Sequence, residues 1–197
     1  MFCPIFIHFN QCAYVKGRTI FDAVRTVEDI LEYTERFKIN GRLIAIDFNK
    51  AFDSVSREFF FVPYPLFVLA LLLSNGFTLF IIIFLAVFQT IVSLPQILTF
   101  ISPYLFIIVL ETLASTIRSD NDIRGIMVDG QEIKFGLFAD DLTGFLKNDK
   151  SLRKFLELVL QFGKCSGLVI NHDKSEILLL GNSFPAPPNL IILLLKT

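Results

Sequence analysis

Three aspartates in two short motifs are the residues of this sequence best suited to chemistry. Asp47 ends the apolar run RLIAID, and the pair Asp140-Asp141 lies 93 residues further on, between the apolar runs IKFGLF and TGFL. A strand end beside a hairpin tip can hold carboxylates rigidly together, and we expect the Asp47 and Asp140 carboxylates within about 4 to 7 Å of each other. Carboxylates so placed can bind two Mg²⁺ ions, the arrangement that nucleotidyl transfer from a nucleoside triphosphate requires.

Each motif taken alone has a simpler interpretation. An Asp-Asp pair between two apolar strands is usually a polar turn. An aspartate between a strand and a following helix is commonly a helix N-cap. The two motifs become specific only together, in this order and with these flanking residues.

The elements that must position these aspartates follow from hydrophobic periodicity and capping signals. The capping-box pattern of Thr19 and Asp22 predicts a helix over 19–38 that Gly41 closes, followed by a buried strand ending at Asp47. Ser102 and Pro103 suit the N-cap and first position of a second helix. The further expected elements are that helix over 103–118, a hairpin of IKFGLF and TGFL, a helix over 150–162 ending at Gly163, and strands at 168–170 and 177–180.

The composition is unusual for a soluble domain. Of the 197 residues, 53% are apolar, and the 19% that are charged fall below the usual share of about 25%. The net charge of -1 argues mildly against nucleic-acid binding, unless the chain is part of a larger and more basic protein. Three cysteines and two distant histidines show no disulfide framework or zinc spacing, which favours a reducing intracellular setting.

The middle of the chain carries no charge at all from Phe59 to Leu110. Two apolar runs, 59–73 and 77–92, predict two helices broken near residues 74–76, and the second approaches the length of about 17 residues that spans a bilayer. This stretch keeps an alternative open, in which the chain is a membrane-inserted structural or interaction protein whose helices lie within 59–110. Basic residues flank the stretch on both sides and give no orientation.

The two acidic motifs and their surroundings together resemble a known family. IDFNKAFDSV resembles the A motif of non-LTR retrotransposon (LINE-type) reverse transcriptases, and FADD is similar to their C motif. SGLVINHDKSEILLLG, QCAYVKGRTIFDAV and ISPYLFIIVLETLASTIR resemble their D motif, their fingers-to-palm entry and the end of their B motif. The resemblance implies an α/β (α+β) fold, a palm-like antiparallel sheet backed by helices, here interrupted by the apolar helical insertion.

The resemblance also implies roles for individual residues. Asp47 and Asp140 would be the principal ligands of two Mg²⁺ ions, with Asp141 beside them and the backbone carbonyl of Phe48 as a further candidate. Lys174 stands at the position of the D-motif lysine and would protonate the leaving pyrophosphate as a general acid. The simpler interpretation of Lys174 is a solvated turn lysine.

Three more residues would contact substrates if the resemblance holds. Phe52 stands where the family places a side chain under the sugar of the incoming nucleotide, although 23 phenylalanines make a core role the default. Lys16 and Arg18 would reach phosphate or template, although charges at a helix entry are more often only surface groups. The implied partners are an RNA template, a DNA primer and deoxynucleotides.

The stretch that should hold the B motif departs from the family pattern. SLPQILTFISPYLF keeps Ser102-Pro103, but the glycines that let the backbone bend against template and nucleotide are absent. A frameshift or mis-splicing between about residues 59 and 100 accounts for this, and we expect an inactive fragment of a protein that is nuclear in the parent element. The expected division is 10–58, fingers and palm entry; 59–100, aberrant apolar segment; 101–182, palm; and 183–197, a Pro-rich break and apolar tail.

Overall fold

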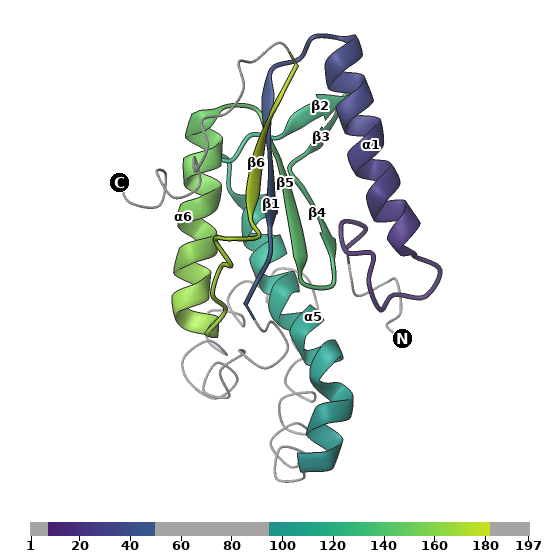
Figure 1. The fold of residues 1–197 in the computed structure, drawn as a ribbon, viewed down its shortest axis with the longest axis vertical. Coiled ribbons are helices and arrows are strands. Elements are labelled where there is room, and N and C mark those ends of the chain that lie inside the picture. The colour runs from purple at the N-terminus through teal and green to yellow at the C-terminus, as the bar shows by residue number, and fades with distance from the viewer. Residues whose placement is uncertain (1–7, 50–94, 182–197) are drawn as a thin grey trace.

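A four-stranded antiparallel sheet is the centre of the computed structural model, which describes residues 8–49 and 95–181 (Figure 1). The strand order is β4-β5-β1-β6, so β1, from the N-terminal part of the chain, lies between two strands from the C-terminal part. A separate two-stranded sheet joins β2 and β3. The strands are β1 (Gly41–Ile46), β2 (Ile126–Val128), β3 (Gln131–Ile133), β4 (Phe135–Phe138), β5 (Asp141–Leu146) and β6 (Glu176–Leu180).

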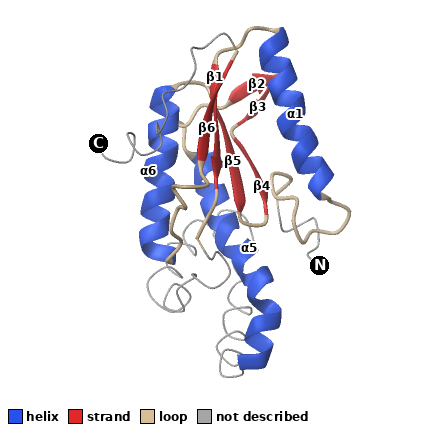
Figure 2. Cartoon of the chain, in the orientation of Figure 1, coloured by secondary structure: helices blue, strands red, loops and turns tan. Residues whose placement is uncertain are grey.

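Helices cover both faces of this sheet (Figure 2). Helices α5 (Pro95–Ser119) and α6 (Asp149–Ser166) pack on one face, where side chains such as Ile44 of β1 and Phe155 of α6 belong to one buried core. Helix α1 (Ile20–Arg36) lies on the other face, where Ile30, Leu43 and Phe145 belong to a second, smaller cluster. Ile44 and Leu43 alternate between the two cores because successive side chains of a strand point to opposite faces.

The predicted first helix is confirmed, including its start. Thr19 is the N-cap of α1, and the reciprocal capping box with Asp22 is present. The prediction that Gly41 ends this helix is wrong, because the helix ends at Arg36 and Gly41 is the first residue of β1. A Cβ at this position would lie 2.5 Å from the Cδ1 atom of Ile126, so that side chain would have to shift, and 3.2 Å from the carbonyl oxygen of Leu146.

The second predicted helix begins earlier than the sequence suggested. The backbone of α5 is helical from Pro95, so Ser102 and Pro103 lie inside the helix and not at its start. Pro95 is itself well suited to the first helical position, where its missing N–H has no partner to lose. The boundary expected at residue 100 therefore falls within a helix.

The C-terminal elements agree with expectation except at two turns. The hairpin of β4 and β5 and the strand β6 are confirmed. Helix α6 does not end at Gly163 but continues to Ser166, and Gly167 caps it in the left-handed conformation with φ of 83°. The predicted strand at 168–170 is reduced to a single bridge between Ile170 and Phe48.

The small β2–β3 hairpin was not predicted, although the sequence held a signal for it. Its turn is Asp129-Gly130, with φ of 47° and 82°, and Val128 pairs with Gln131 across it. An Asp-Gly pair is a preferred two-residue hairpin turn because both positions need positive φ. The short strands on either side made this signal easy to overlook.

The described part of the chain confirms the α+β fold class. Within the described residues, 8–49 and 95–181, no helix has both the length and the apolar character that crossing a bilayer needs. The two apolar helices predicted within residues 59–92 lie outside the described residues, as does Phe52.

Candidate active site

Asp47 directly follows β1 and Asp141 is the first residue of β5, and these are the two central strands of the sheet. Strands β1 and β5 are antiparallel with Ile46 opposite Leu142, and continuing this register by one residue brings Asp47 opposite Asp141. Side chains directly opposite in such a pair have Cβ atoms about 4.5–5.5 Å apart and point to the same face. Both aspartates therefore lie on the sheet face that α1 covers, since Ile46 and Leu142 belong to the core under α5 and α6.

Asp140 lies in the two-residue turn that joins β4 to β5. Phe138 pairs with Asp141, which leaves Ala139 and Asp140 as the turn residues. Ala139 has φ of 54°, in the left-handed region that costs a residue with a side chain about 1–2 kcal/mol. Strained backbone of this kind persists only where the surrounding structure holds it, and it is concentrated at functional sites.

The side chain of Gln11 holds this turn from outside the sheet. Its Oε1 atom accepts hydrogen bonds from the N–H groups of Ala13 at 2.9 Å and of Ala139 at 3.3 Å. Gln11 is only 1% exposed, and its Nε2 atom has no hydrogen-bond partner among the described residues. The amide therefore acts on the turn through its carbonyl oxygen.

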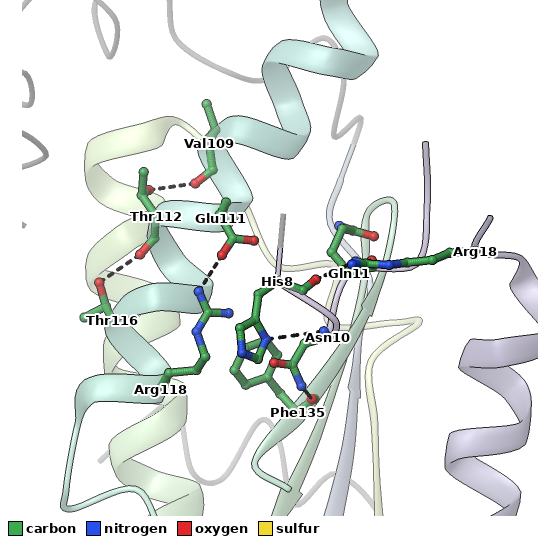
Figure 3. A network of polar contacts seen from close by, with 10 residues as sticks. All are labelled: His8, Asn10, Gln11, Arg18, Val109, Glu111, Thr112, Thr116, Arg118 and Phe135. Atoms are coloured by element: carbon green, nitrogen blue, oxygen red, sulfur yellow. Dashed lines mark hydrogen bonds and ion pairs between the residues drawn. The ribbon is translucent and has the colours of Figure 1, made fainter. Parts of the chain in front are cut away.

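The segment before α1 is itself tied to strand β4. The N–H of Leu137 donates to the carbonyl of Asn10 at 2.7 Å, and the N–H of Cys12 donates to the carbonyl of Leu137 at 2.9 Å. The guanidinium of Arg18 donates to two carbonyls of the same segment, those of His8 and Gln11, at 2.6 Å each (Figure 3). These bonds give Gln11 a stable place from which to hold the turn.

The pKa of the Asp141 carboxyl group reflects its burial and the charged groups around it. Burial raises the pKa of Asp141, and the charges of Asp140 and then Asp47 raise it further. The ammonium group of Lys174 acts in the opposite direction and lowers this pKa. Asp140, Asp47 and Lys174 are therefore all within electrostatic reach of Asp141.

A cavity of about 450 Å³ opens beside these residues, between α1 and the sheet. Asp47, Asp141 and Lys174 contribute its charged groups. The rest of its wall is mainly apolar and comes from α1, from the sheet and from residues 9–12 before α1. It includes Val24, Val27, Ala45, Gly136, Phe138 and Phe145.

The turn before β6 reaches across to Asp47. The side-chain amide of Asn171 donates to Oδ2 of Asp47 at 2.8 Å, and the backbone N–H of Asn171 donates to the carbonyl of Asp47 at 2.8 Å. The backbone N–H of Asp47 in turn donates to Oγ of Ser175 at 3.2 Å. Asp47 is therefore held through its carboxylate, its carbonyl and its amide by one short turn.

Comparison with known proteins identifies the family. A family model described as reverse transcriptase (RNA-dependent DNA polymerase) matches residues 3–187. This chain belongs to the reverse transcriptase family. A stretch of 53 residues is also 38% identical to the transposon TX1 uncharacterized 149 kDa protein of Xenopus laevis. The match covers 27% of this chain and 4% of that protein, and it agrees with a reverse transcriptase of the non-LTR transposon type.

The reverse transcriptase fold brings the four predicted catalytic residues to one place. Asp47 directly follows β1, Asp141 begins the paired strand β5, Asp140 lies in the turn, and Lys174 lies in the segment before β6. The expected separation of about 4 to 7 Å between the Asp47 and Asp140 carboxylates stays a prediction. The register of β1 and β5, continued by one residue past Ile46, places Asp141, the second aspartate of the FADD motif, opposite Asp47.

The protein groups available to a metal ion are few. Across residues 8–49 and 95–181, no three His, Cys, Asp or Glu side chains come close enough together to hold a metal ion by themselves. Mg²⁺ is usually bound by one or two carboxylates together with substrate phosphates and waters, not by a cage of protein ligands alone. The facing pair Asp47 and Asp141 fits that mode of binding.

The predicted substrate-binding residues have different surroundings. Phe48 is 3% exposed and belongs to the core under α5 and α6, so only its backbone could contribute to the site. Arg18 holds backbone carbonyls of its own segment, as described above, whereas Lys16 is exposed. Contacts of Lys16 and Arg18 with a template stay predictions.

Three residues of the site were missed in the sequence. They are Asn171, Ser175 and Gln11, whose side chains are polar but uncharged. Each contacts one of the aspartate motifs from more than 120 positions away in the sequence. The run NHDKS did carry a turn signal, because Asn commonly hydrogen-bonds to the backbone two residues on. Nothing in the sequence showed which strand this turn would meet.

Proposed function

We propose that this chain carries the palm active site of a non-LTR retrotransposon reverse transcriptase, with its metal-binding carboxylates retained and its polymerase activity lost. The first part is supported by the register of β1 and β5, which sets Asp47 opposite Asp141 when it is continued by one residue, and by the cavity that both residues line, with Asp140 in the adjoining turn. The family acts on a nucleic-acid template and nucleotide substrates, and we propose an RNA template, a DNA primer and deoxynucleotides here.

The three aspartates are the groups that would hold Mg²⁺. Burial is the largest cause of the raised pKa of Asp141, and the charges of Asp140 and Asp47 add to it, so a divalent cation at this place would offset their repulsion. Two bound Mg²⁺ ions would supply activation of the primer hydroxyl and neutralisation of the pyrophosphate. The facing strands hold Asp47 and Asp141 more rigidly than loops would.

Lys174 is the residue we propose as general acid. It lines the same cavity as Asp47 and Asp141, and it is close enough to Asp141 to lower the pKa of that carboxyl group. From this place its ammonium group can give a proton to a leaving pyrophosphate oxygen.

The loss of activity is proposed from the region of the B motif. The stretch SLPQILTFISPYLF has no glycine, and its backbone is part of helix α5 from Pro95 onward. A polymerase must align template base, primer end and nucleotide to within about half an ångström. A regular helix with bulky apolar side chains cannot bend toward a base as a glycine-containing segment can. The net charge of -1 adds little attraction for a nucleic-acid backbone.

Two assays on the purified chain test the two halves of this proposal. In the first, a primed RNA template is incubated with deoxynucleotides and Mg²⁺ or Mn²⁺, and we expect no more extension than with Asp140→Ala. In the second, electron paramagnetic resonance follows Mn²⁺ binding. We expect weak binding that Asp47→Ala reduces at least about tenfold, since a carboxylate ligand is lost.

The outcomes separate the two halves. Extension by the wild type that disappears in Asp140→Ala would show that the chain is still an enzyme. Mn²⁺ binding that does not change in Asp47→Ala would refute the metal site itself. His172→Ala is the matched control, because this exposed residue lies in the turn beside the site and has no part in the proposal.

A further inference from the structure

The turn of residues 171–175 forms a closed set of hydrogen bonds around Asp47. Asn171 contributes most of them, with its side-chain amide on Oδ2 of Asp47 and its backbone N–H on the carbonyl of the same residue, both at 2.8 Å. The hydroxyl of Ser175 donates to the carbonyl of Asn171 at 2.7 Å, and the same Oγ atom of Ser175 accepts the N–H of Asp47 at 3.2 Å. These four hydrogen bonds join Asp47, Asn171 and Ser175 into one ring.

The turn also holds its own shape. The carbonyl of Asn171 accepts the N–H groups of Lys174 at 3.3 Å and Ser175 at 3.0 Å, and its Oδ1 atom accepts the N–H of Asp173 at 3.3 Å. Ser175 is 7% exposed, so its hydroxyl bonds are shielded from water. Both ends of the Asn171 amide are therefore occupied, one by the turn and the other by Asp47.

The contact to Asp47 has a specific consequence for its carboxylate. A donor on Oδ2 fixes the rotation of the carboxylate plane, whose torsion is otherwise broad. No donor to Oδ1 is found among the described residues, and Asp47 lines the cavity. Because the donor is a neutral amide, it orients the carboxylate without cancelling the negative charge that a cation needs.

We infer that Asn171 is a positioning residue that orients the carboxylate of Asp47 for metal binding. The inference rests on the metal site proposed above and extends it to a residue outside the aspartate motifs. Groups that hydrogen-bond to a metal ligand typically change metal affinity about 10–100-fold when they are removed. The same turn carries Lys174, so one structural unit places both the ligand and the proposed general acid.

The test compares Asn171→Ala in two backgrounds by Mn²⁺ titration of the full chain, followed by electron paramagnetic resonance. In the wild-type background we expect about tenfold weaker Mn²⁺ binding. In the Asp47→Ala background, where residual binding depends on Asp140 and Asp141, we expect no further loss. Such a double-mutant cycle isolates an effect that acts through Asp47 from a general loosening of the fold. Circular dichroism without metal confirms folding, and His172→Ala is the control within the turn.

Each outcome is decisive. An equal loss of affinity in both backgrounds, or none in either, would overturn the inference while leaving the metal site in place. Binding that is insensitive to Asp47→Ala would overturn the proposed function and the inference with it. If Asn171→Ala does not fold, Asn171→Ser replaces it, because the serine hydroxyl can still accept the N–H of Asp173 and keep the turn, while it lacks the amide donor. The same two-background comparison then applies.

Discussion

At the scale of single residues, the aspartates of the candidate site show a conflict between the stability of the metal-free chain and the metal binding proposed above. Asp141 is placed by the register directly opposite Asp47 and next to Asp140, and its pKa is raised by burial and by both neighbours. Carboxylates at such separations repel one another when no cation is present. Residues kept in an unfavourable place by the rest of the fold are common at functional sites.

Asp141→Asn should therefore stabilise the metal-free chain while weakening Mn²⁺ binding. A carboxyl group whose pKa is raised above its ordinary value of 3.8 weakens the fold as pH rises through that value, because the native state holds the proton longer than the unfolded state. The gain should be absent below about pH 3.8 and present at pH 7. It should stay below about 1 kcal/mol, because the carboxyl group of Asp141 is only partly buried and solvent screens its charge. Urea unfolding at the two pH values measures it. A destabilised variant at pH 7 would contradict the account.

The charged members of the site could be predicted from the sequence, and the neutral ones could not. Asp47, Asp140, Asp141 and Lys174 stand in motifs whose chemistry is visible in the residue types themselves. Gln11, by contrast, acts through a carbonyl oxygen that accepts from Ala139 across 128 positions. An amide in a polar segment is typical of any loop, so its role appears only when the fold brings it to the turn.

At the scale of elements, the hydrophobic period predicted the three described helices and the strands β1, β4, β5 and β6 but not where each ends, and it missed the β2–β3 hairpin. Helix α6 is the clearest example, because Gly163 resembles a terminator and the helix continues past it to Ser166. Glycine is needed there for a reason outside the helix. A Cβ at residue 163 would lie 2.5 Å from the carbonyl oxygen of Leu168, where the chain turns back after its cap at Gly167.

Gly163→Ala separates these two roles of glycine. Helix propensity alone would make this substitution stabilising by about 1 kcal/mol. The close approach of the Leu168 carbonyl predicts the opposite, a loss of about 1–3 kcal/mol, because backbone must shift to admit the methyl group. Urea denaturation gives the sign directly. A surface alanine substitution in the same helix, Gln161→Ala, serves as the control and should change stability by less than about 0.5 kcal/mol.

At the scale of the whole molecule, a polar network joins the N-terminal segment to the far helix layer. The carboxylate of Glu111 in α5 accepts the backbone N–H of His8. It also pairs with the guanidinium of Arg118, whose Cζ atom lies 5.8 Å from the ring centre of Phe135 (Figure 3). Burial raises the pKa of Glu111 despite Arg118, and burial together with Arg118 lowers the pKa of His8. The network thus connects the segment that carries Gln11 to helix α5.

Arg118→Met should destabilise the protein by about 3 kcal/mol at pH 8, because it leaves Glu111 charged and without its partner. The loss should shrink at pH 5. A carboxyl group whose pKa is raised in the folded state contributes stability while it is protonated, and this contribution is lost as pH rises through that pKa. Because removing Arg118 raises the pKa of Glu111 further, more of Glu111 is protonated at pH 5 and the loss is smaller there. Removing Arg118 would also let the pKa of His8 rise toward its ordinary value. Protonation of His8 at pH 5 would then cost less stability, which further reduces the loss at that pH. Thermal unfolding at both pH values measures this difference.

A double variant is the control for this prediction. Glu111→Gln combined with Arg118→Met removes both charges and leaves a neutral acceptor for the N–H of His8. It should recover most of the stability at pH 8 and should lose the difference between the two pH values. An equally large loss in the double variant would mean that packing of Arg118 on Phe135, and not the ion pair, is what matters.

The central position of β1 has a consequence for how the chain can fold. Both of its neighbours, β5 and β6, begin about a hundred positions or more further along, so the sheet forms only by closing long loops. Chains rich in such non-local pairings fold slowly, and during synthesis β1 must wait for both partners to leave the ribosome. Loop-closure entropy grows only logarithmically with length, about 0.6 kcal/mol for each doubling. The pairing that sets Asp47 opposite Asp141 therefore depends little on how many residues connect β1 to α5, and large changes in that connection need not cost the sheet its thermodynamic stability.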